Sequence, residues 1–93
     1  MEKYIKIYYS LLQSDLTRKA QWIYSFLLTA FELNEPLSYS ISELSKELEY
    51  DKKTIRNGLK ELEDNGYIQI IKEKGKKNKF SLVRETYNNI VNT

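Results

Sequence analysis

Two residue types that carry much of protein chemistry are absent from the sequence: its 93 residues include no cysteine and no histidine. Without cysteine there is no disulfide framework, no thiolate metal site and no cysteine nucleophile. Without histidine, the commonest general base and the commonest zinc ligand are missing. The acidic clusters, such as Glu61-Glu63-Asp64, fit capped and solvated helix faces. We therefore expect no catalytic residue, no cofactor and no metal ion.

Long apolar runs are lacking as well. The longest apolar stretches are far below the roughly 20 residues that a membrane-spanning helix needs, and the sequence shows no signal peptide. We expect an intracellular, cytoplasmic protein with no membrane partner and no evident small-molecule ligand. The length predicts a single domain, residues 1–93, with a modest hydrophobic core.

The charged residues are unevenly distributed, although the net charge is only +2. Residues 1–51 carry five basic and eight acidic side chains, whereas residues 52–84 carry ten basic and four acidic ones, a net charge of +6. A basic half of this kind is expected in a protein that binds a polyanion. Alternatively, the lysines only keep a small domain in solution, but they gather on two adjacent predicted elements.

The N-terminal half is dominated by one predicted helix. Residues 4–9 alternate weakly and are rich in β-formers, which predicts a short N-terminal strand or an extended arm. Thr17 is a good N-cap, and apolar side chains then recur at helical spacing, so we expect an amphipathic helix over residues 18–32. Trp22 and Phe26 lie off its apolar stripe, where they either cover the N-terminal segment or form a dimer contact.

The middle of the chain predicts a pair of short helices joined by a tight turn. The Asn34-Glu35-Pro36 sequence ends the long helix, and residues 37–40 are expected to form a strand that pairs with a later hairpin. Ser40 and Glu43 form a capping box for a helix over residues 41–49. Asp51 caps a second helix, residues 52–65, which stops at Asn65-Gly66. The inner faces of the pair are predicted to bury Leu44, Leu48, Ile55, Leu59 and Leu62.

A lysine-rich hairpin follows this helix pair. Residues 72–79 read KEKGKKNK, with five lysines and a central Gly75 in the turn, and they lie between strand-like residues 67–71 and 80–83. A hairpin placed directly after a helix-turn-helix is the wing of a winged helix. Residues 84–93 form either a short C-terminal helix or a frayed tail. The predicted fold is α+β: a winged helix-turn-helix with three helices, a β-hairpin wing and a short N-terminal strand.

The residue types on the outer face of the second helix suit DNA recognition. Arg56 can bond bidentately to guanine and Asn57 to adenine. Thr54 can contact a phosphate or a thymine methyl, whereas lysines mainly position the protein on phosphates. The wing lysines are expected to follow the backbone or enter the minor groove, which is narrow and negative in A/T-rich DNA. The candidate DNA-binding residues are Lys52, Lys53, Thr54, Arg56, Asn57 and Lys60 on the helix, and Lys72, Lys74, Lys76, Lys77 and Lys79 on the wing.

Residues 40–83 resemble the winged helix-turn-helix superfamily almost element for element. The clearest marks are the sequences Lys53-Thr54-Ile55-Arg56, Leu59-Lys60-Glu61-Leu62 and Gly66-Tyr67-Ile68. The resemblance implies that residues 51–64 carry the recognition helix and residues 67–83 the wing.

The N-terminal segment is similar to the start of the winged-helix domains of plasmid and phage replication initiators, through the helix opening Leu16-Thr17-Arg18-Lys19-Ala20. This resemblance implies a protein of a plasmid, phage or other mobile element. Its role would lie in plasmid replication, plasmid transfer or transcription regulation. A full initiator carries further domains, so a single-domain accessory protein is the expectation.

Three functions stay open at this point. The first is a double-stranded DNA binder, which would be a homodimer because one short helix reads few base pairs. Its dimer surface would be the N-terminal arm with the first helix, or residues 84–93. The second is a binder of single strands or replication junctions, and the third is a protein-interaction module that uses Trp22 and Phe26. The second function would need stacking platforms, for which the candidates are Tyr8, Tyr9, Tyr39 and Tyr50.

Overall fold

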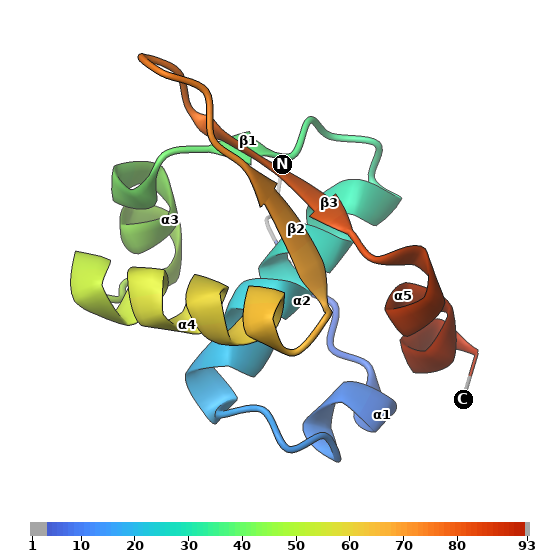
Figure 1. The fold of residues 1–93 in the computed structure, drawn as a ribbon. Coiled ribbons are helices and arrows are strands. Elements are labelled where there is room, and N and C mark those ends of the chain that lie inside the picture. Colours follow the sequence, from blue (N-terminus) through green and yellow to red (C-terminus); the bar gives the residue numbers. More distant parts are fainter. Residues whose placement is uncertain (1–3, 93) are drawn as a thin grey trace.

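The computed structural model describes residues 4–92 and shows an α+β fold (Figure 1). A long central helix is followed by a pair of shorter helices and a β-hairpin, as expected for a winged helix-turn-helix, so the predicted fold class is confirmed. In chain order the elements are α1 (Tyr9–Leu12), α2 (Arg18–Glu32), β1 (Ser38–Tyr39), α3 (Ile41–Leu48), α4 (Lys52–Asp64), β2 (Ile68–Ile71), β3 (Asn78–Leu82) and α5 (Arg84–Val91).

Helix α2 is the centre of the core and has the predicted bounds. The Thr17 side chain accepts a hydrogen bond from the Ala20 backbone N–H at 3.3 Å and so caps the helix. At the other end, Asn34 takes the left-handed conformation with φ 59°. The predicted apolar stripe is buried except for Phe31, which is 45% exposed; its buried members are Ala20, Ile23, Tyr24, Leu27 and Leu28.

The N-terminal segment does not form the predicted strand. Residues 4–8 have no regular secondary structure, and Tyr9 already begins the short helix α1. The Lys6 backbone N–H donates to the side-chain oxygen of Thr29 on α2, at 2.8 Å. The segment is therefore the extended arm that was predicted as the alternative, and it lies on α2.

Three antiparallel strands form a small sheet in the order β1-β3-β2. The predicted pairing of β1 with the hairpin is confirmed, since Ser38 lies opposite Lys79. Within the hairpin, Ile70 lies opposite Phe80 and Ile68 lies opposite Leu82. These cross-strand pairs lie on one face because strand side chains alternate. Ile68 and Phe80 are buried, so this face closes the core over α2.

Helix α4 crosses α2 at a glycine. Gly58 is buried, and a Cβ atom added there would collide with Cδ1 of Ile23. Ile23 is itself fully buried in the core. The absence of a side chain at Gly58 therefore allows the close approach of the two helices.

The C-terminal residues form helix α5, which confirms the predicted helix; Thr93 lies outside the described residues. The Tyr87 hydroxyl on α5 donates to Glu32 Oε2 at 2.7 Å. The Tyr8 hydroxyl on the arm donates to the same oxygen at 2.8 Å, and Lys6 Nζ is 3.5 Å from Glu32 Oε1. One carboxylate at the end of α2 thus holds both the arm and α5.

These contacts shift the pKa values of Glu32 and Tyr87. Partial burial acts to raise the pKa of the Glu32 carboxyl, but the hydrogen bonds from Tyr87 and Tyr8 and the charge of Lys6 outweigh it, and the pKa is lowered. The hydrogen bond to Glu32, together with burial, raises the pKa of Tyr87 to about 12. A lowered carboxyl pKa stabilises the fold above the pKa of the unfolded chain, and this contribution is lost as the pH falls.

Glu32→Gln is therefore expected to lower the free energy of unfolding at pH 7 by about 1–2 kcal/mol, because it removes charge-assisted hydrogen bonds. The difference from the wild type should shrink below about pH 4.3, where the unfolded carboxyl is protonated. Urea denaturation at several pH values measures this. The matched control is Glu35→Gln, which should change little at pH 7. A Glu32→Gln difference that is equal at pH 7 and pH 3 would contradict the assignment.

Candidate nucleic-acid interface

The turn between α3 and α4 sets the position of the second helix. Helix α3 ends at Glu49, which takes the left-handed conformation with φ 57°, and the Ser45 hydroxyl donates to the Tyr50 carbonyl oxygen. Asp51 Oδ1 then accepts a hydrogen bond from the Thr54 backbone N–H at 2.7 Å. Hydrogen bonding to Thr54 holds the pKa of the Asp51 carboxyl below its usual range. The predicted N-cap of α4 is confirmed.

Helix α4 has one buried and one exposed face. Ile55, Leu59 and Leu62 are buried on the inner side, as predicted. Thr54 is half-buried beside the cap. The outer face begins at the N-terminus of the helix and carries the exposed side chains of Lys52, Lys53, Arg56, Asn57 and Lys60.

The tip of the wing is the turn that joins β2 to β3. Gly75 takes φ +74° in this turn, and the Lys76 backbone N–H donates to the Glu73 carbonyl oxygen at 3.1 Å. Glycine suits the position because a left-handed conformation costs it nothing. All five predicted wing lysines are exposed: Lys72, Lys74, Lys76, Lys77 and Lys79.

Carboxylates pair with several of the candidate cations. Lys60 Nζ is 3.1 Å from Asp64 Oδ2 one turn along α4. On the wing, Lys76 and Lys79 both pair with Glu73. Within residues 4–92 no hydrogen bond or salt bridge is found for the side chains of Lys52, Lys53, Arg56, Lys72 and Lys74.

Glu43 connects the wing to the helix pair. Its Oε1 accepts the Ser40 backbone N–H at 3.0 Å, while the Glu43 N–H donates to Ser40 Oγ, so the predicted capping box is confirmed. Its other oxygen, Oε2, is 2.8 Å from Lys77 Nζ. The Lys77 ammonium, followed by the Ser40 N–H, lowers the pKa of the Glu43 carboxyl. The same carboxylate thus caps α3 and holds the wing above it.

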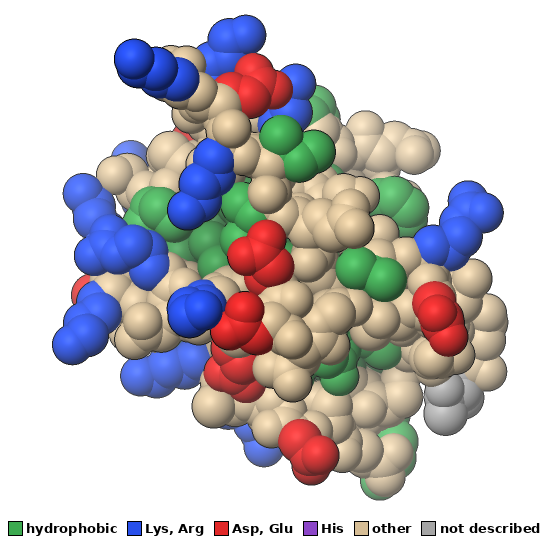
Figure 2. Space-filling view, in the orientation of Figure 1, with side chains coloured by type: hydrophobic (Ala, Val, Ile, Leu, Met, Phe, Trp, Pro, Cys, Tyr) green, Lys and Arg blue, Asp and Glu red, His purple; other side chains and the backbone are tan. Residues whose placement is uncertain are grey.

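The candidate residues lie on one side of the molecule. Figure 1 shows the wing tip above α3, with the N-terminal end of α4 on the same side. In the same orientation, Figure 2 shows Lys and Arg side chains gathered at the wing tip and over the N-terminal part of α4, with an acidic side chain among those at the wing tip and others elsewhere on this face. The structure therefore brings the two predicted sets of cations into one region, and their contacts with DNA stay a prediction.

The acidic partners of these lysines were not predicted from the sequence. Glu73 stands inside the lysine cluster, so its pairing with neighbours had a local signal. The pair between Glu43 and Lys77 had no local signal, because the two residues are 34 positions apart in the sequence. Glu61, predicted to lie on a solvated helix face, also makes an exposed contact that was not predicted: its carboxylate accepts hydrogen bonds from both the backbone N–H and the hydroxyl of Thr17, each at 2.7 Å.

The aromatic side chains offer few free surfaces. Tyr39 packs edge-on against Phe26, with ring centroids 5.3 Å apart. Phe26 therefore packs on β1, a contact that was not predicted, while Trp22 is half-buried; a dimer contact through these two residues stays a prediction. Tyr8 is held by Glu32, and Tyr50 is partly buried against the core. Of the predicted stacking platforms, Tyr9 is the exposed one, at 74%.

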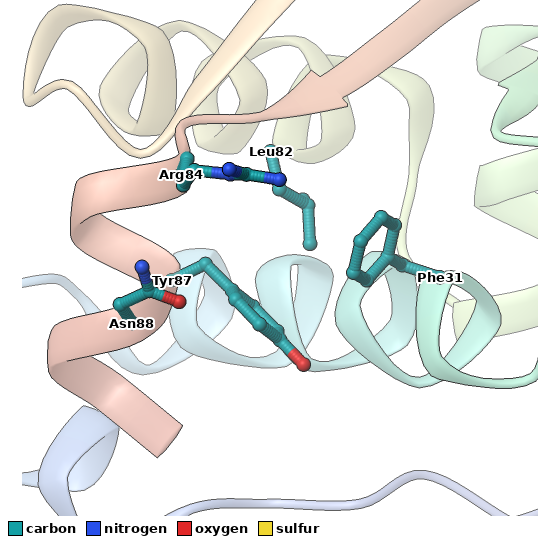
Figure 3. Close-up of a pocket in the computed structure, with 5 residues that line it drawn as sticks. All are labelled: Phe31, Leu82, Arg84, Tyr87 and Asn88. Atoms are coloured by element: carbon teal, nitrogen blue, oxygen red, sulfur yellow. The ribbon is translucent and has the colours of Figure 1, made fainter. Parts of the chain in front are cut away.

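A hollow of about 480 Å³ lies beside α5, away from the basic region (Figure 3). Phe31 and Leu82 form its apolar part, and Tyr87 lies along another side. Arg84 and Asn88 add polar groups. None of the candidate DNA-binding residues lines it.

Residues 24–68 match the family described as the helix-turn-helix domain. The matched segment begins within α2, contains α3, the turn and α4, and ends at the first residue of β2. Together with the hairpin that follows, this segment forms a winged helix-turn-helix. No curated protein and no solved structure matches the chain. Across residues 4–92, no helix has the length and apolar character needed to cross a membrane.

Proposed function

We propose that the protein is a non-enzymatic, cytoplasmic binder of double-stranded DNA, formed by a single winged-helix domain. The main support for this proposal is the capped helix α4, which buries one face and exposes lysine, arginine and asparagine side chains on the other. The helix-turn-helix match supports DNA as the partner. In such folds the second helix of the pair lies in the major groove and its N-terminal residues contact base edges.

The exposed side chains on α4 fall into two groups, those suited to contact bases and those suited to contact phosphates. Arg56 and Asn57 carry the planar groups that pair bidentately with guanine and adenine, so they are proposed to read sequence. Lys52, Lys53 and Lys60 are proposed to position the helix on phosphates. The wing lysines are proposed to contact the backbone or an A/T-rich minor groove.

Arg56→Ala is therefore expected to relax the preference for one base position, at a cost of about 1–3 kcal/mol on the preferred site. Selection of bound fragments from a random duplex library, done with wild type and variant, measures this. Equal losses on every sequence would show that Arg56 contacts only phosphate.

The same selection tests the proposed homodimer. Two copies with two-fold symmetry would select palindromic half-sites about one helical turn apart. Enrichment of single, unpaired sites would contradict the dimer. The similarity of residues 16–20 to replication initiators supports a role in plasmid replication, plasmid transfer or transcription regulation on a mobile element.

Competition between duplex and single-stranded DNA tests the choice of partner. Unpaired bases bind by stacking on exposed aromatic rings. Three of the four tyrosines predicted to serve this purpose are covered or held by neighbouring residues, which favours duplex DNA as the partner. Duplex DNA is expected to displace a labelled duplex at lower concentration than a single strand of the same sequence. The reverse order would contradict the proposal.

A further inference from the structure

Two wing lysines converge on one carboxylate. Lys76 Nζ is 3.4 Å from Glu73 Oε2, and Lys79 Nζ is 3.1 Å from Glu73 Oε1. The two ammonium groups therefore approach different oxygens of the same anion. Lys76 lies in the turn and Lys79 on β3, so the hairpin itself brings the two groups to Glu73.

This arrangement has the form of a site for a phosphodiester. A backbone phosphate presents two non-bridging oxygens that share one negative charge, much as a carboxylate does. Lysine binds phosphate as a point charge, so a pair of ammonium groups spaced for one carboxylate is also spaced for one phosphate. The Lys76 and Lys79 side chains are 72% and 59% exposed, which leaves them open to an incoming ligand.

We propose that Lys76 and Lys79 form a phosphate-binding pair on the wing, and that Glu73 occupies this pair until a DNA phosphate displaces it. The inference rests on the proposed function and adds a residue that opposes binding. Glu73 would lower the affinity of the wing for DNA without contacting DNA itself.

The surroundings of Glu73 make it displaceable. Its charged form is favoured by Lys79 and then by Lys76, which lower the pKa of the Glu73 carboxyl. It is therefore an anion at neutral pH and competes directly with phosphate. Exposed ion pairs contribute little to stability because water and salt screen them, so exchanging one anion for another on these lysines costs little.

Glu43 differs from Glu73 in this respect. It accepts the Ser40 N–H as part of the α3 cap, so the Lys77 pair is tied to the helix scaffold. The pair between Lys77 and Glu43 would hold the wing in place, whereas the pairs made by Glu73 lie within the wing and are free to open.

The test is the affinity of Glu73→Gln for a labelled duplex over a range of salt concentrations. The variant is expected to bind about threefold to fivefold more tightly than the wild type at low salt. Its plot of log affinity against log salt should be steeper by about one, because one more counterion is released on binding. The matched control is Glu85→Gln on α5, the same change of charge at an exposed position away from the wing.

The control variant should bind within about twofold of the wild type, since a distant exposed charge is screened by salt. Equal tightening by both variants would overturn the inference, because it would reflect net charge alone. Unchanged or weaker binding by Glu73→Gln would also overturn it, provided that the wild type binds. Failure of the wild type to bind any duplex would instead overturn the proposed function, and this inference with it.

A second comparison uses Lys76→Gln with Lys79→Gln. When both lysines are replaced, Glu73→Gln should no longer increase the affinity for DNA. The two ammonium groups that the loss of the Glu73 carboxylate would make available to phosphate are then absent. A gain that persists without the two lysines would contradict their role.

Discussion

Gly58→Val is expected to lower the free energy of unfolding by about 3 kcal/mol, because it forces a branched side chain into a filled core. The first added carbon already collides with Ile23, and Ile23 is enclosed on all sides, with no exposed surface. Either Ile23 leaves its rotamer or α4 moves away from α2. Movement of α4 would also displace the outer face that is proposed to read DNA.

Asn57→Val is the matched control for stability. It adds the same side chain to the same helix at an exposed position, and valine and asparagine have similar helix propensities. Urea denaturation should show a change of less than about 0.5 kcal/mol for Asn57→Val. Similar midpoints for the two variants would contradict the close approach at Gly58.

The second large effect is expected from reversing a charge on α4. Arg56→Glu should weaken binding to the preferred duplex by about 30- to 100-fold, because it would remove the proposed base contact and set a carboxylate against phosphates. Titration of a labelled duplex measures the loss. The variant should keep the stability of the wild type, since Arg56 is exposed and no hydrogen bond or ion pair of its side chain is found within residues 4–92.

Arg84→Glu provides the control. It makes the same change of charge at the first residue of α5, which Figure 1 places on the side away from the wing tip and α3. We expect a loss of only a few-fold, from the net charge alone. Equal losses of affinity for the two variants would mean that binding depends on net charge alone. That result would contradict the proposal that α4 contacts the DNA.

The elements whose signals are local could be predicted from the sequence. Thr17, Ser40 and Asp51 each cap a helix within three residues of themselves, so their pattern is complete in a short window. Gly66 and Gly75 likewise mark the end of α4 and the turn of the wing through their own positive φ values. The outer face of α4 followed from the same periodicity, because the buried residues define it by exclusion.

The pairing of β1 with the hairpin was predicted, but side-chain contacts between distant residues were not. The composition of the arm allowed either a strand or an extended arm, and it forms an arm on α2 because Glu32 and Thr29 bind Tyr8 and Lys6 there. No local pattern pairs residues more than 20 positions apart. For the same reason, the candidate site was found as a set of cations without the carboxylate of Glu43 that holds Lys77.

The affinity of the wild-type protein for a labelled duplex, measured by fluorescence anisotropy over a range of salt concentrations, is the most direct test of the proposed DNA binding. With about five phosphate contacts shared by α4 and the wing, log affinity should fall with log salt at a slope of about −4.5. No binding at low salt, or an affinity independent of salt, would contradict the proposal that the lysines and the arginine of α4 and the wing bind DNA.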